Sequence, residues 1–107
     1  MNEQPAEPGE WGFRPADGAI SPVNPPGFVW RPQQYAAAYE LQCARDPGFG
    51  GSPYLAADIR YNCHGPPKTF DQGKWYWRFR YTDRSGRKSA WSGTRSFVVT
   101  PRSIAFP

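Results

Sequence analysis

The chain has 107 residues with a formal net charge of +4, and 17% of its residues are aromatic. This length suits one domain, the aromatic content excludes a disordered chain, and no apolar run approaches the roughly 18 residues of a membrane span. The 13 Pro and 11 Gly residues also exclude long helices. Composition therefore predicts a small β-rich domain with an aromatic core.

Residues 1–23 contain four Pro and three Gly with no hydrophobic period, which predicts an extended, loosely ordered leader. Trp11 and Phe13 are candidates to dock on the domain that follows. The first residues lack the basic start and apolar stretch of a signal peptide. A cytoplasmic location is therefore expected, or a periplasmic one if the sequence is an internal fragment of an exported protein.

The β-sandwich is predicted over residues 24–101, with 102–107 as a tail or linker. A short first strand is predicted over 24–32. Its aromatic residues Phe28 and Trp30 stand two positions apart, so both side chains are expected to face inward. Alternation also predicts a strand over 38–45, closed by a turn at 46–48.

The second half of the domain begins with a weaker strand over 54–62 and a loop over 64–74, where consecutive prolines oppose a central strand. The strongest strand pattern follows at 75–83, and a hairpin turn at 83–86 leads to a last strand with Phe97 and Val99 in alternation. Short strands with turns at this spacing predict an all-β sandwich.

The aromatic side chains of the strongest strand could form either the core or a platform for sugar rings. Their strict alternation favours the core. The set comprises Trp30, Trp75, Trp77, Phe79 and Tyr81.

Two cysteines, Cys43 and Cys63, allow one disulfide, but we favour two buried thiols. Cys63 and His64 are adjacent, so in an extended segment their side chains point to opposite faces and cannot form a nucleophile pair. The sequence predicts no metal site and no cofactor.

The outward face of the 75–83 strand presents Tyr76, Arg78 and Arg80, and we place Trp91 and Arg95 of the next segment beside them. Residues 74–102 carry eight Lys and Arg against one Asp. One interpretation is an arginine–tryptophan ladder that stiffens the sheet. The other is a docking face for a second domain or for an anionic glycan, since arginine binds carboxylates with two hydrogen bonds. No nucleic-acid-binding motif is present.

Several motifs together resemble a known module. They are NPPGFVW at 24–30, YELQCARDPGF at 39–49, GKWYWRFRYTD at 73–83, SAWS at 89–92 and RSFVV at 95–99. They resemble the N-terminal fibronectin type III-like domain of heparinase II/III-type polysaccharide lyases, in particular the oligo-alginate lyase branch, over about Asn24 to Thr100.

The resemblance implies a fibronectin type III/immunoglobulin-like antiparallel β-sandwich that is not an enzyme itself. In that family the sandwich precedes an α/α toroid, which supplies the residues for β-elimination on uronates. The expected role is an accessory domain that packs on such a catalytic toroid, and the alternative is a stand-alone binding module for anionic uronate glycans. The motif SAWS is also similar to the Trp–Ser repeat that stacks with arginines in cytokine-receptor fibronectin domains. Trp75 stands where fibronectin-like domains usually place a corner tyrosine, so its indole N–H is expected to replace the phenol as donor.

Overall fold

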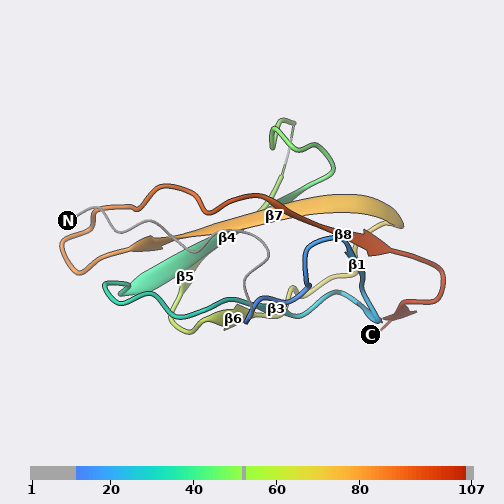
Figure 1. Ribbon diagram of the computed structural model, residues 1–107, viewed down its shortest axis with the longest axis horizontal. Helices are drawn as coiled ribbons and strands as arrows, with labels where there is room; N and C mark the ends of the chain where they lie inside the picture. Colours follow the sequence, from blue (N-terminus) through green and yellow to red (C-terminus); the bar gives the residue numbers. More distant parts are fainter. Residues whose placement is uncertain (1–11, 52, 106–107) are drawn as a thin grey trace.

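The computed structural model describes residues 12–51 and 53–105, and these form strands and loops without a helix. Five strands make the larger sheet in the order β1-β8-β7-β4-β5, and two short pairs, β2-β9 and β3-β6, complete the fold. Figure 1 shows β7 running along most of the molecule, with β3 and β6 in a separate layer. The strands are β1 (Ala19–Ile20), β2 (Val23–Asn24), β3 (Phe28–Val29), β4 (Ala38–Ala44), β5 (Tyr54–Ile59), β6 (Cys63–His64), β7 (Gly73–Thr82), β8 (Arg95–Val99) and β9 (Ile104–Ala105).

The antiparallel pair β4 and β7 forms the centre of the larger sheet and confirms the two strands with the clearest alternation. Leu41 lies opposite Phe79 and Cys43 lies opposite Trp77, and all four side chains are buried. Because side chains in a strand alternate between faces, the intervening polar residues lie on the other face of the sheet. The pairing therefore separates a hydrophobic inner face from a charged outer face.

Strand β5 ends at Ile59, three residues before the end that the sequence predicts. Its pairing with β4 shifts register between Tyr39 and Leu41, and Asp58 adopts a positive φ of 57° in this irregular stretch. A β-bulge of this kind bends the strand and disrupts its pairing locally. Pairing with β4 resumes at Ile59, opposite Tyr39, and the strand ends there.

Part of the segment predicted as a loosely ordered leader belongs to the sheet. Strand β1 runs parallel to β8, with Ala19 opposite Phe97, and the side chain of Phe13 is buried in the core. Trp11 lies outside the described residues. Near the other end, β9 pairs in parallel with β2, within the segment predicted as a tail. The fold thus incorporates residues on both sides of the predicted domain limits.

The second layer is built on β3, which pairs with β6 and bridges to Arg14 through Val29. Phe28 and Trp30 are fully buried, as the alternation predicts. His64 lies in β6, whereas the sequence predicts it in a loop. A two-residue strand is too short to show a period in the sequence.

The core between the layers is mainly aromatic, and this confirms the interpretation of the alternating rings. Trp30 stacks on Phe79 with ring centroids 5.4 Å apart, and Phe28 meets Trp77 edge-on at 5.3 Å. Edge-to-face and offset contacts of this kind add to the energy of burial. Trp75, at the start of β7, is only partly buried and packs against the edge of this cluster.

One expectation about the cysteines is wrong. Cys43 is fully buried, and burial raises the pKa of its thiol far above the usual value. Cys63 is exposed, and both cysteines are free. Cys63 lies in the short strand β6, which pairs with β3 and with no other strand of the described chain.

Candidate functional site

The outer face of β7 carries three of the five predicted site residues. Tyr76, Arg78 and Arg80 alternate with the buried Trp77 and Phe79, and each is half-buried. Two-residue periodicity places the three side chains in one row along the strand.

Trp91 joins this row through contacts between its ring and two guanidinium groups. The guanidinium carbon of Arg78 lies 4.5 Å from the centroid of the Trp91 ring, and that of Arg80 lies 4.2 Å away. Arg78 also lies over the ring of Phe49, at 4.0 Å. The expected stacking of arginine on Trp91 is thus present, and the ring of Phe49 extends it.

Two serines hold Trp91 in this position. The backbone N–H of Ser89 donates to the carbonyl oxygen of Tyr81, and its hydroxyl oxygen accepts a hydrogen bond from the Tyr81 N–H. Ser92 makes the same pair of contacts with Phe79. The serine hydroxyls thus replace backbone carbonyls as acceptors, and the segment between them follows β7 although it is not a regular strand. This explains why the SAWS motif lies beside the arginines of β7.

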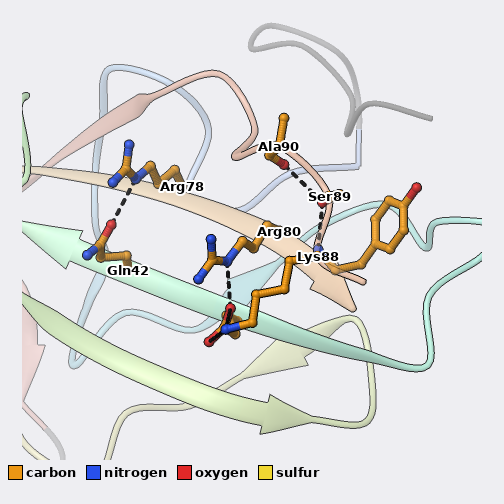
Figure 2. A network of polar contacts seen from close by, with 8 residues as sticks. Gln42, Arg78, Arg80, Lys88, Ser89 and Ala90 are labelled. Carbon is orange, nitrogen blue, oxygen red and sulfur yellow. Dashed lines mark hydrogen bonds and ion pairs between the residues drawn. The ribbon is translucent and has the colours of Figure 1, made fainter. Parts of the chain in front are cut away.

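The two arginines pair with different residues of β4 (Figure 2). Arg80 forms an ion pair with Glu40, with Nε and Oε1 2.5 Å apart, and Lys88 lies 3.4 Å from the same oxygen. Arg78 donates from Nε to the amide oxygen of Gln42, at 2.8 Å. The charge of Arg80 is therefore balanced by a carboxylate, while that of Arg78 meets a neutral amide.

The electrostatics of the row follow from these contacts. Burial acts to raise the pKa of Glu40, but the hydrogen bond and charge of Arg80, with help from Lys88, hold that pKa below its usual value. Partial burial, followed by the nearby charge of Arg80, lowers the pKa of Arg78. An arginine still stays charged at neutral pH.

Arg95 does not belong to this outer face, contrary to the sequence-based prediction. Its exposed fraction is 1%, and its guanidinium carbon lies 3.8 Å from the centroid of the Phe13 ring. Its Nη1 donates to the carbonyl oxygen of Gly93 at 3.0 Å. Arg95 precedes Phe97 by two residues, so both side chains lie on the inner face of β8. The two-residue alternation of β8, which places Arg95 on the same face as Phe97, indicates this buried position in the sequence.

Trp75 makes the corner contact that the sequence suggests. Its indole Nε1–H donates to the carbonyl oxygen of Asp71, at 2.8 Å. In sandwich domains a corner tyrosine makes the equivalent bond from the start of a strand to the backbone a few residues upstream. The guanidinium carbon of Arg45 lies 5.0 Å from the centroid of the Trp75 ring.

Sequence reasoning missed an apolar groove of about 840 Å³ between β1, β2 and the β3–β6 pair. Phe28 and Val29 line it, and Ile20 at its side has an exposed fraction of 63%. Strands of two residues give no periodic signal, so the sequence could not place these apolar side chains together.

Cys63 and His64 both line this groove. Nε2 of His64 lies 2.7 Å from the hydroxyl oxygen of Tyr54, and burial lowers the pKa of the imidazole. Among the described residues no group of three His, Cys, Asp or Glu is arranged to hold a metal ion, and no helix could span a membrane.

Comparison with known proteins gives a result at the level of fold. No model of a protein family matches the sequence, and no curated protein is similar to it. The solved structure of an Fn3-like protein from Clostridium thermocellum superposes with a TM-score of 0.64 over 92% of this chain and 96% of that chain, at 16% sequence identity. The chain has a fibronectin type III-like fold. This confirms the predicted all-β sandwich, and at such low identity the likeness shows the fold alone.

Proposed function

We propose that this chain is a non-catalytic accessory β-sandwich domain of a heparinase II/III-like, alginate-type polysaccharide lyase, packed on or extending a catalytic toroid. The fibronectin type III-like fold supports the first part of this proposal. The lyase context comes from the sequence motifs, above all NPPGFVW and the RDPGF turn.

The observation that carries the proposal is the position of the RDPGF turn. Asp46 accepts a hydrogen bond from the Gly48 N–H on its Oδ2, and its carbonyl oxygen accepts one from the Phe49 N–H. The turn thereby places the Phe49 ring against the guanidinium group of Arg78. The most specific motif and the ladder are thus one structural unit, as expected if the resemblance reflects a shared domain.

The use of the aromatic rings also favours an accessory role over a sugar-stacking platform. Trp77, Phe79 and Tyr81 are in the core, and the Trp91 ring is in contact with two guanidinium groups. Ring stacking on sugars needs an open aromatic face, which the three buried rings do not offer.

A stand-alone module for anionic uronate glycans is the second candidate. One observation favours it, namely that Arg78 pairs with a neutral amide and so retains a positive charge on the surface of the sheet. Arginine binds carboxylate through two parallel hydrogen bonds.

The coding sequence next to these 107 residues tests the accessory-domain proposal. We expect it to encode several hundred residues of paired helices carrying Tyr, His and Asn. The whole protein should then release unsaturated uronates from alginate, while the present domain alone should release none. A neighbouring domain of another catalytic class, or uronate release by this domain alone, would contradict the proposal.

A further inference from the structure

Two neighbouring cross-strand pairs on the outer face differ by a single charge. Glu40 lies opposite Arg80 and Gln42 lies opposite Arg78 in the β4–β7 register, and in each pair the arginine Nε donates to the side-chain oxygen. The two pairs have the same backbone geometry and the same hydrogen bond. Only the Arg80 pair is neutralised.

Part of the guanidinium group of Arg78 is already in contact with other side chains. The group lies between the rings of Phe49 and Trp91, and Gln42 takes the hydrogen bond from Nε. Within residues 12–51 and 53–105, the two terminal nitrogens have no hydrogen-bond or ion-pair partner. They form the edge of the guanidinium group that accommodates the two oxygens of a carboxylate. The rings and the amide fix this edge before a ligand arrives, which lowers the entropic cost of binding.

We infer that the terminal nitrogens of Arg78 bind the carboxylate of a uronate residue in an anionic polysaccharide. This inference rests on the proposed function, because it assumes a polysaccharide substrate. Arg80 is not part of this site, because its guanidinium group is already paired with the carboxylate of Glu40. Arg95 is not part of it either, because its side chain is buried in the core.

The row on β7 favours a linear polymer over a single acidic side chain of a partner protein. Lys74 and Tyr76 precede Arg78 on the same face, and Nζ of Lys74 lies 5.4 Å from the centroid of the Tyr76 ring. At a rise of roughly 3.3 Å per residue, Lys74 and Arg78 stand about 13 Å apart in a straight line. Lys74, like Arg78, has no carboxylate partner among the described residues. On the β8 side of this row, Oδ1 of Asp17 accepts a hydrogen bond from the Ser96 N–H. Two positive charges spaced along one strand match the carboxylates that repeat along a linear polysaccharide.

Substitutions of the β4 partners test the inference without removing the arginines. Gln42→Glu should neutralise Arg78 as Glu40 neutralises Arg80, and should weaken the binding of alginate hexamers at least fivefold. Glu40→Gln should release Arg80 and strengthen that binding. Gln34→Glu is the matched control, because it makes the same change of charge at an exposed position beside the 83–86 turn and should leave binding unchanged.

Calorimetric titration of the 107-residue chain gives the affinity, and the Arg78 Nε–H resonance in NMR spectra gives the location. We expect alginate hexamers to bind and to shift this resonance, mannose hexamers not to bind, and Arg78→Lys to reduce binding because lysine lacks the planar pair of donors. Absence of binding by the wild type, or equal weakening by Gln42→Glu and Gln34→Glu, would overturn the inference. Glutamate hexamers binding as tightly as alginate hexamers would overturn it in favour of a protein partner. Each of these failures would leave the accessory role intact, because that role is tested on the neighbouring coding sequence and on the activity of the whole protein.

Discussion

The two faces of β7 use aromatic and charged side chains in opposite ways. On the inner face Phe79 is surrounded by other rings and contributes through burial. On the outer face Trp91 lies in partial contact with solvent, and its ring is held by Arg78 and Arg80. The comparison shows that one strand can combine a hydrophobic core with a cationic surface because successive side chains point to opposite faces of the sheet. It also implies that substitutions on the inner face should be far more costly.

The largest effect is expected from Phe79→Ala. Phe79 is fully buried and contacts Trp30, Tyr39 and Phe13, so its removal leaves a cavity in the centre of the core. The free energy of unfolding should fall by about 3–5 kcal/mol, measured by urea denaturation. Tyr76→Ala on the outer face is the control and should cost well under half as much. Equal losses would show that the two faces do not differ as described.

Arg95→Ala tests the charged residue that lies on the inner face. The substitution removes the side chain packed against Phe13 and its hydrogen bond to the Gly93 carbonyl oxygen. We expect a loss of about 2–4 kcal/mol, as for other buried groups that combine packing with a hydrogen bond. Arg95→Met retains the length of the stem and should restore part of the loss. If Arg95→Ala has no effect on the denaturation midpoint, the side chain contributes nothing to the core.

Trp91→Ala should have a moderate effect that is specific to the outer face. Two cation–π contacts of about 0.5–1 kcal/mol each would be lost, giving a decrease of about 1–2 kcal/mol in the free energy of unfolding. A double-mutant cycle with Arg80→Met measures the coupling directly. Additive effects of the two substitutions would contradict a stacking contact between these residues.

The smallest effect concerns pH and the Glu40–Arg80 pair. Because the folded pKa of Glu40 lies below its usual value of 4.5, the stabilisation that it provides is complete above that value and is lost as pH falls through the lower folded pKa. The stability difference between wild type and Glu40→Gln should therefore be greatest near neutral pH and disappear in acid. Denaturation curves between pH 7 and roughly pH 2 check this, and a difference that grows in acid would contradict the ion pair.

The sequence predicts the centre of the molecule better than its edges. Strands β4 and β7 are long enough to show two-residue alternation, so the buried positions of Leu41, Trp77 and Phe79 could be predicted. Strands β1, β2 and β9 have two residues each and depend on distant partners, with Ala19 pairing against Phe97. No local pattern specifies such contacts.

The candidate site could likewise be predicted from the sequence only in part. The outward row of Tyr76, Arg78 and Arg80 follows from alternation in β7. The difference between Arg78 and Arg80 does not, because it depends on the cross-strand register that places Gln42 and Glu40 opposite them. The inward position of Arg95 was predictable from its spacing to Phe97, but its charge argued for the surface, and packing against Phe13 overrode that preference.

The bulge in β5 has a consequence for how copies of the domain behave when they meet. Strand β5 is the last of its sheet, and Leu55 on it is largely exposed, which is the arrangement that invites a strand from another molecule to join. The positive φ of Asp58 bends this edge strand, and the Asp58–Arg60 ion pair places two charges beside it. The domain thereby resists edge-to-edge association into fibrils, a protection that matters most when many copies are crowded together.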